Sequence, residues 1–268
     1  GLGDGMGGEV AQMLAASGDS IAGFDVDKKG VASLEKGPAG IGGDHFLGTL
    51  DITDRKGILR FRNRVLERFN HVDTVLSNVG IGFFSPFEEA DLEKALKCLE
   101  INVIGASAIF QAFLPSMRER RKGKLIAMSS LVGRIPFPFE SIYSASKFAI
   151  TGLMCSLRYE VEPFGIRVAL IEPAQVSTTF AAKIHVLPPE GSPYRDRARR
   201  FIARDDELIK TAPTPDAAAK RIFRVVKAEK PALFNQVDFM STFFLWLNNY
   251  LPRAWRDAIL VNHMDIKV

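Results

Sequence analysis

The sequence predicts an α/β fold, a doubly wound parallel sheet of about seven strands with helices on both faces. Three observations predict it. Short apolar runs alternate with helical patterns along the chain, the runs are apolar throughout, and a glycine-rich turn precedes the first helical pattern. Continuous apolar runs are typical of strands buried on both faces, and strand–helix alternation gives parallel strands joined by right-handed crossovers.

The 268 residues are expected to form one domain, a common length for a single α/β unit. The sequence opens on the glycine turn, and the strand that leads into such a turn is central in a doubly wound sheet. A short strand is therefore expected ahead of residue 1. The other strands are expected over 20–25, 46–50, 72–77, 124–129 and 166–171, and helices over 8–17, 54–69, 88–120, 141–162 and 215–228.

Composition excludes several classes of protein. Apolar residues make up 47% and charged residues 25%, the balance of a soluble globular protein, and a net charge of +4 is too small to indicate nucleic-acid binding. Two cysteines, Cys98 and Cys155, do not make a disulfide framework, so a reducing, cytoplasmic location is expected. The four histidines lack ligand spacing, so no metal is expected. No apolar run approaches the roughly 20 residues that span a bilayer.

The glycine-rich turn predicts a phosphate-binding site. Gly1, Gly3, Gly5 and Gly7 stand immediately before a helix expected over 9–16. Glycines let the backbone approach a pyrophosphate closely, and the N–H groups at the start of the helix hold it. For the cluster alone, a flexible glycine-rich terminus is an equally good interpretation. The expected contacts are Gly1, Gly5, Met6 and Gly7.

An aspartate ends the next expected strand. Asp25 lies eighteen residues after Gly7, where a carboxylate would hold the adenosine ribose hydroxyls of a dinucleotide. It would repel a 2′-phosphate, and Asp4 adds a second negative charge nearby, so the expected cofactor is NAD. The alternative is that Asp25 and Asp27 only solvate a strand end. Asp51, after the following strand, is expected to hydrogen-bond the adenine amino group.

A tyrosine and a lysine share one face of a later helix. Tyr143 and Lys147 are four residues apart, which is about one helical turn. An ammonium beside a phenol favours the phenolate and should lower the pKa of Tyr143 from about 10. Such a tyrosine can take a proton from an alcohol or give one to a ketone. Alone, the pair is better interpreted as an ordinary surface pair.

Two further polar residues support the catalytic interpretation. Ser130 follows the apolar run LIAMS at the strand edge where ligands bind in doubly wound sheets, and its hydroxyl could hydrogen-bond a substrate oxygen. Asn102 lies among apolar residues in LEINVIG. By itself, Asn102 is better interpreted as a buried, hydrogen-bonded amide.

Together these features resemble the short-chain dehydrogenase/reductase family, in the members with a single Rossmann-like domain. The matching pieces run in the family's order from residue 1 to 178: GLGDGMG, DITD, SNVG, INVIG, MSS, YSASK and IEPAQVST. The resemblance implies one dehydrogenase domain over 1–268 and a catalytic tetrad of Asn102, Ser130, Tyr143 and Lys147. In that family the asparagine supports a water relay and the lysine holds the nicotinamide ribose. The implied cofactor site also includes Ile52, Asn78, Gly80, Tyr143, Lys147, Pro173, Val176 and Thr178.

The sequence departs from the family pattern at three places. Ser77–Asn78 replaces the usual paired asparagines, Val79 the following alanine, and Pro173–Ala174 the usual Pro-Gly. None of these changes removes a chemical group that the reaction needs. Ala174 should stiffen a loop that contacts the cofactor, so cofactor affinity is the property expected to change.

The family's variable substrate loop is expected over 179–213, and it carries a basic cluster. The cluster is interpreted as the solvated face of a surface helix, with an anionic substrate group or an acidic membrane as the alternative. Similarity to members acting on steroids and retinoids favours a lipophilic alcohol. The cluster is Arg195, Arg197, Arg199, Arg200 and Arg204, and the expected apolar pocket lining is Phe83, Phe84, Phe87 and 135–139.

An aromatic segment over 231–261 closes the sequence. Its apolar run FMSTFFLWL, at 239–247, has nine residues and is too short to span a membrane. It is expected to pack over the pocket or against a second subunit. Peripheral attachment to a membrane, with Arg253 and Arg256 at the headgroups, is the alternative. The resemblance implies a homodimer or homotetramer.

The sequence thus predicts an oxidoreductase that transfers a hydride between NAD(H) and a lipophilic secondary alcohol or ketone. The main alternative is a catalytically silent dinucleotide-binding regulatory protein of the same fold. An epimerase or dehydratase is disfavoured because no sugar-nucleotide domain is visible. The enoyl reductases of the family space their tyrosine and lysine more widely than the four residues seen here.

Overall fold

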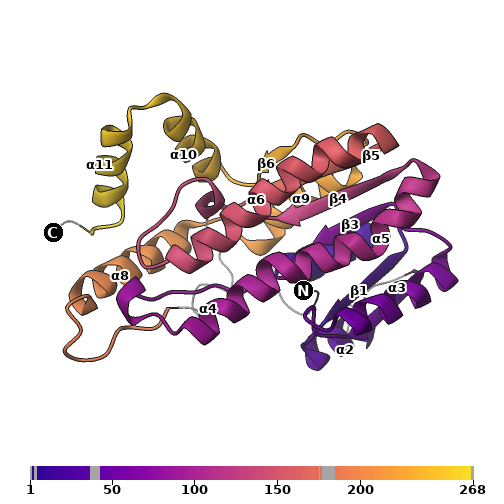
Figure 1. Ribbon diagram of the computed structural model, residues 1–268, viewed down its shortest axis with the longest axis horizontal. Coiled ribbons are helices and arrows are strands. Elements are labelled where there is room, and N and C mark those ends of the chain that lie inside the picture. Colours follow the sequence, from indigo (N-terminus) through magenta and orange to yellow (C-terminus); the bar gives the residue numbers. More distant parts are fainter. Residues whose placement is uncertain (1, 3–4, 37–42, 175, 177–184, 267–268) are drawn as a thin grey trace.

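The computed structural model of the protein describes residues 2, 5–36, 43–174, 176 and 185–266. These residues form two parallel sheets, one of order β1-β2 and one of order β3-β4-β5-β6 (Figure 1). The doubly wound α/β class predicted from the sequence is confirmed. The strands are β1 Ile21–Asp25, β2 His45–Thr49, β3 Thr74–Ser77, β4 Gly123–Met128, β5 Ile166–Glu172 and β6 Phe234–Gln236.

Helices connect the strands and continue after the last one. Four of the five helices expected from the periodic apolar pattern are present with ends shifted by at most two residues, and the fifth, over 88–120, is interrupted. The helices are α1 Met6–Ala16, α2 Lys28–Lys36, α3 Arg55–Phe69, α4 Leu92–Leu99, α5 Ala106–Arg120, α6 Ser141–Val161, α8 Arg195–Thr211, α9 Pro215–Lys227, α10 Phe239–Tyr250 and α11 Arg253–His263.

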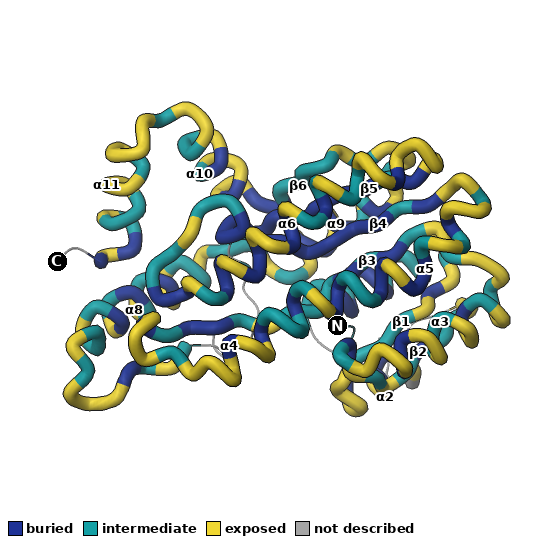
Figure 2. The backbone as a smooth tube through the Cα atoms, in the orientation of Figure 1, coloured by how far each residue is buried: buried dark blue, intermediate teal, exposed yellow. Residues whose placement is uncertain are grey.

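The central strands are buried on both faces, as their continuous apolar runs predict. On β4, Leu125 and Ala127 pack in the cluster formed with α3, α5 and α6. Ile126 and Met128, the alternate residues, pack in the cluster formed with α1 and α9. Successive side chains of a strand point to opposite faces, so each face needs its own helix layer. Figure 2 shows these strands as the buried centre of the molecule.

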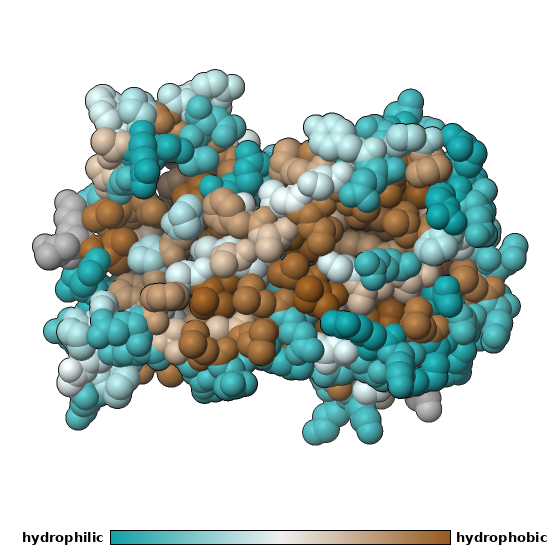
Figure 3. All heavy atoms as spheres, in the orientation of Figure 1, coloured by the Kyte–Doolittle hydropathy of each residue, from teal (hydrophilic) through white to brown (hydrophobic). Residues whose placement is uncertain are grey.

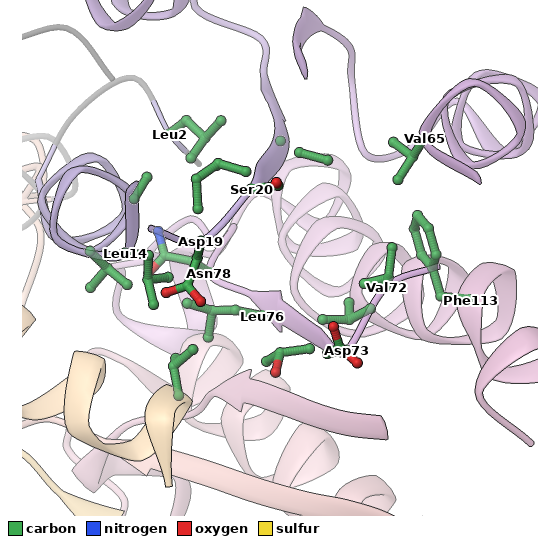
Figure 4. A pocket seen from close by; sticks show the side chains of 18 of the residues that line it. Leu2, Leu14, Asp19, Ser20, Val65, Val72, Asp73, Leu76, Asn78 and Phe113 are labelled. Carbon is green, nitrogen blue, oxygen red and sulfur yellow. The ribbon is translucent and has the colours of Figure 1, made fainter. Parts of the chain in front are cut away.

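The predicted count of about seven strands is too high for the described residues, which contain six. The first helix, α1, begins at Met6, directly after the glycine turn. A space of about 600 Å³ lies between β1 and β3, which are not hydrogen-bonded to each other in the part of the chain that the structure describes. Figure 4 shows Leu14, Val65, Leu76 and Phe113 around this space.

The single helix expected over 88–120 is interrupted. Asp91 accepts hydrogen bonds from the amides of Glu93 and Lys94 and so begins α4. A π-helical segment, Glu100–Gly105, then separates α4 from α5. Such single π turns often occur at functional sites, and this one carries Asn102.

The helical stretch Leu92–Arg120 also qualifies by length and composition as a membrane span. Its best 18-residue window has a mean hydropathy of 1.4, and 44% of that window is buried. The expectation of no such stretch is therefore wrong, because it considered only uninterrupted apolar residues. In this fold α5 packs against α3, β3 and β4 as a core helix.

The basic cluster of the substrate loop lies on α8 and binds the chain that follows α11. Arg197 donates to the carbonyl of Ile266 at 3.1 Å, and Arg204 donates to that of His263 at 3.0 Å. These carbonyls belong to the end of a helix and its next turn, where the helix dipole favours positive charge. Arginines of the cluster thus hydrogen-bond to other parts of the chain, so the cluster is not a purely solvated face.

Candidate active site

A cavity of about 660 Å³ opens at the carboxyl ends of β1, β3, β4 and β5. In doubly wound sheets, ligands bind in the crevice outside these ends. The cavity is lined by most of the residues that the sequence singled out. Those residues are Gly5, Met6, Asp25, Asp51, Ile52, Asn78, Gly80, Ser130, Tyr143, Lys147, Pro173 and Val176.

The remaining predicted residues lie elsewhere. Gly7 is buried in α1 and faces the space between β1 and β3, because its position in the helix turns it away from the cavity. Asn102 is buried behind the lining. Gly1 and Thr178 are outside the described residues, as is Asp4.

The predicted aromatic lining is partly wrong. Phe137 does line the cavity, and Phe83 and Phe84 are buried in clusters beside it. Phe87, in contrast, is 70% exposed, because it lies in a 3₁₀ turn on the surface before α4.

At one end of the cavity, turns bring together the residues predicted to hold the adenosine. Gly5 has a φ of 69° immediately before α1, a backbone conformation that favours glycine. Asp25 accepts a hydrogen bond from the amide of Asp27 at 3.0 Å, so part of its carboxylate orders the turn after β1. Asp51 accepts from both the amide and the hydroxyl of Thr53 at 2.8 Å. The Thr53 amide holds the pKa of Asp51 below its usual range.

Tyr143 and Lys147 lie together at the other end, on one face of α6. The Lys147 Nζ atom is 5.6 Å from the centroid of the Tyr143 ring and donates to the carbonyl of Met128 at 2.9 Å. Both residues are buried. The ammonium is therefore fixed between the end of β4 and the phenol.

Burial affects the two pKa values in opposite directions. It lowers the pKa of Lys147 to about 8, although the nearby Cys98 raises it slightly. For Tyr143, burial and the charge of Glu140 raise the pKa above its usual value, and a hydrogen bond with Ser130 only partly opposes them. The expected lowering of the phenol pKa by Lys147 is therefore not found. Desolvation penalises the charged form of both groups, and it is the largest cause of both shifts.

Ser130 is held beside the phenol by a short turn. It begins the 3₁₀ turn Leu131–Gly133 and accepts from the amide of Val132 at 3.3 Å. Its hydroxyl also donates to the carbonyl of Pro173 at 3.3 Å. The residue after β4 is thereby tied to the residue after β5, and both line the cavity.

Asn102 braces the loop after β3. Its Oδ1 accepts from the amide of Ile81 and its Nδ2 donates to the carbonyl of the same residue, both at 2.8 Å, and Nδ2 also donates to Ser146 Oγ at 3.0 Å. A Cβ added at Gly80 would lie 3.3 Å from Asn102 Oδ1 and 3.5 Å from Lys147 Nζ. The loop thus passes close to both side chains, and Asn102 connects it to α6.

Three titratable residues of the lining were missed by sequence reasoning: Glu140, Asp205 and His263. Burial and the charge of Asp205 raise the pKa of Glu140 to about 8. A carboxylate in the apolar run IPFPFE was the available signal for Glu140. Asp205 stands among many charged residues of α8, and nothing in the sequence separates it from them.

The residues present fit a nicotinamide dinucleotide. The glycine with positive φ at the start of α1 and the Asp25 turn form one end of the cavity, and Gly80 leaves the floor free of side chain next to Lys147. Backbone N–H groups at the start of a helix favour phosphate, and a carboxylate after the next strand favours ribose hydroxyls. The cavity is also of the size that ordinary cofactor sites have.

The fold and the cavity define a doubly wound α/β protein with a ligand site at the carboxyl ends of its strands. A sequence profile described as "short chain dehydrogenase" matches residues 1–186, and the chain belongs to that family. Human 17-beta-hydroxysteroid dehydrogenase type 1 is 33% identical over 190 residues, which are 69% of this chain and 57% of the relative. Dehydrogenase/reductase SDR family member 7B from mouse is 29% identical over 92% of this chain and 75% of the relative.

Solved structures agree on the fold. A short-chain dehydrogenase from Streptomyces avermitilis superposes with a TM-score of 0.80 at 26% identity, over 97% of this chain and 92% of the other. Two more distant structures hold different cofactors. One, from Burkholderia phymatum, is in complex with NAD, and one, from Burkholderia cenocepacia, is in complex with NADP; their TM-scores are 0.79 and 0.76. The chain spans little more than half the length of the human relative.

Replacing Glu140 with Gln should change how stability depends on pH. The carboxyl has an ordinary pKa of 4.5 and a folded value of about 8, so its stabilising contribution is complete below pH 4.5 and is lost as the pH rises through 8. Across that window the free energy of unfolding should fall by up to about 1.4 kcal/mol per pH unit. Glu140→Gln removes this loss. The melting temperature of the variant minus that of the unchanged protein should therefore increase from pH 5 to pH 9.

Thermal unfolding at several pH values checks this expectation. The exposed Glu229→Gln variant serves as the control and should follow the unchanged protein. A constant difference between Glu140→Gln and the unchanged protein at all pH values would contradict the assigned burial of the carboxyl.

Proposed function

We propose that the protein is an oxidoreductase that transfers a hydride between NAD(H) and a secondary alcohol or ketone. The observation that carries the proposal is the buried pair of Tyr143 and Lys147, fixed against the end of β4 in a cavity that also contains Ser130. A phenol next to a cation and a hydroxyl is a suitable proton donor and acceptor for a reacting C–O group.

In the proposed reduction, the substrate carbonyl lies between Tyr143 and Ser130. The Ser130 hydroxyl would turn from the carbonyl of Pro173 to donate to the substrate oxygen, and the Tyr143 hydroxyl gives its proton to that oxygen. A nicotinamide, when bound, would supply the hydride to the carbonyl carbon in reduction and take it back in oxidation. Lys147 keeps a positive charge beside the resulting phenolate and stabilises it. In alcohol oxidation the same proton moves back to the tyrosine.

In this proposal Asn102 is a positioning residue and does not contact the substrate. Its hydrogen bonds to Ile81 and Ser146 hold the loop after β3 against α6, next to Lys147. The complete set of Asn102, Ser130, Tyr143 and Lys147 supports a working enzyme over a silent regulatory protein. A silent protein would have no need to keep a buried lysine beside a buried tyrosine, because burying a charge destabilises the fold.

A lipophilic substrate is supported by the other side of the cavity. Its lining there includes Phe137, Ile209, Met240, Phe244 and Met264, from four separate segments of the chain. Apolar walls with a few polar groups are typical of sites for lipophilic ligands. The human relative is named for a hydroxysteroid, which agrees with a substrate of this kind.

Tyr143→Phe should lower kcat for alcohol oxidation by at least about 10³-fold, within the range of a lost general acid–base group. The substitution removes one hydroxyl and retains the ring that fills the cavity. NADH binding, followed by fluorescence titration, should be unchanged. Screening steroid, retinoid and aliphatic alcohols for NAD⁺-dependent absorbance gives the assay. A Phe variant with nearly full activity would refute Tyr143 as the proton donor.

The proposal of NAD over NADP is supported by Asp25, which lines the cavity after β1. Its negative charge disfavours a 2′-phosphate and can accept hydrogen bonds from ribose hydroxyls. NADH should accordingly bind well over tenfold more tightly than NADPH, and Asp25→Ala should narrow this gap. Titration of both nucleotides against both proteins measures it. Equal affinities in the unchanged protein would remove the role assigned to Asp25.

We place the protein in the cytoplasm. Two exposed apolar surfaces support association, one with a second subunit and the other, as the alternative to a purely soluble protein, with a membrane surface. Figure 3 shows apolar side chains gathered over α4, α5 and α6, where a second subunit would complete a homodimer or homotetramer. The second surface lies on α10 and α11, where aromatic side chains suit a membrane interface. The first surface includes Leu92, Leu96, Ile104 and Phe148, and the second Phe239, Phe243, Trp246, Tyr250 and Trp255.

Sedimentation distinguishes the two surfaces. Alone, the protein should sediment as a dimer or tetramer, and Leu96→Glu should shift it to a monomer. With anionic vesicles it should pellet, and Trp246→Glu should reduce the pelleted fraction. Absence of binding to the vesicles would remove the membrane contact without affecting the proposed self-association.

A further inference from the structure

One wall of the cavity carries an acidic group that the proposed hydride and proton transfer does not use. Glu140 precedes Tyr143 by three residues and stands immediately before α6. Its side chain is about nine-tenths buried, yet it lines the cavity. Within the described residues, its carboxyl makes no hydrogen bond or ion pair to the rest of the protein. A buried carboxyl without a partner is unfavourable, so a ligand that supplies one would be bound strongly.

A second carboxyl reinforces the first. Asp205, on α8, lines the same cavity and is close enough to Glu140 to raise its pKa. Asp205 lies beside His185. The Nε2 atom of His185 is 3.3 Å from Asp205 Oδ2, and the His185 side chain is only 6% exposed. Arg204, the residue before Asp205, forms an ion pair with Glu207 at 3.0 Å. Glu140 is therefore the carboxyl without a partner among the described residues, and a bound cation would favour its ionised form.

The acidic wall is close to the reacting group. Glu140 and Tyr143 both line the cavity and lie three residues apart at the start of α6, and the charge of Glu140 is one of the causes that raise the pKa of Tyr143. A substrate whose oxygen lies at Tyr143 would share the cavity with Glu140, so a group near the reacting carbon is the one that we place against this carboxyl. The rest of such a substrate would extend along the apolar wall formed by Phe137, Met240 and Phe244.

We propose that Glu140, supported by Asp205, binds a protonated amine of the substrate, so that the substrates are lipophilic amino alcohols or amino ketones with the amine near the reacting carbon. This inference rests on the proposed function. An ammonium carries three donors and a positive charge, which the two carboxyls that line this cavity can accept. A hydroxyl carries no charge, so it would not favour the ionised form of Glu140 as an ammonium does.

The experiment compares three secondary alcohols that differ only at the neighbouring carbon: 1-amino-2-octanol, 1,2-octanediol and 2-octanol. NAD⁺-dependent oxidation at pH 7.5 gives kcat/KM for each. The amino alcohol should exceed 2-octanol at least tenfold. Glu140→Gln should lower the ratio of the two values at least tenfold, and Asp205→Asn should lower it by a smaller factor. Asp196→Asn, an exposed change on the same helix, should leave both values unchanged.

Equilibrium binding separates this inference from the proposed function. Calorimetry should show that 1-amino-2-octanol binds the unchanged protein at least tenfold more tightly than it binds Glu140→Gln. If none of the alcohols is oxidised but this difference in binding is found, the proposed reaction fails and the amine site stands. Preference for the diol, or an amine preference that Glu140→Gln does not reduce, overturns the inference.

Discussion

Burial of the Lys147 ammonium against the carbonyl of Met128 is the constraint on which the rest of the site depends. This contact fixes the start of α6 to the end of β4, and it places the ammonium 5.6 Å from the centre of the Tyr143 ring. A buried cation destabilises a fold unless polar atoms surround it. The carbonyl of Met128 provides one of those atoms. The other surroundings of the lysine are the phenol, Gly80 and the braced loop after β3.

Three loops meet at this point because the strands are parallel. The residues after β3, β4 and β5 all lie at one edge of the sheet, and hydrogen bonds connect them to each other and to α6. Asn102 connects the first loop to α6, and Ser130 connects the second to the third through the carbonyl of Pro173. Each bond joins segments far apart in the sequence. The site is therefore rigid only when the whole sheet is formed.

The pKa values show how strongly environment controls the chemistry. Tyr143 and Lys147 lie close together, and burial moves the pKa of each toward favouring its neutral form. Glu140 follows the same rule and has its pKa raised to about 8. In such a site a bound ligand with charge of its own has a large effect on protonation. A change in the charge of Glu140 therefore changes the pKa of Tyr143 as well.

The sequence by itself determined the class of fold and the principal residues of the site. Continuous apolar runs predicted strands buried on both faces, and the four-residue spacing predicted that Tyr143 and Lys147 share a face of α6. These features are local and follow from periodicity. The tertiary structure decided what depends on contacts distant in sequence: the burial that raises the pKa of Tyr143, the arginines of α8 that bind the end of α11, and the meeting of Glu140 with Asp205. Desolvation is a property of the packed molecule, so no spacing of residues along the chain could have predicted it.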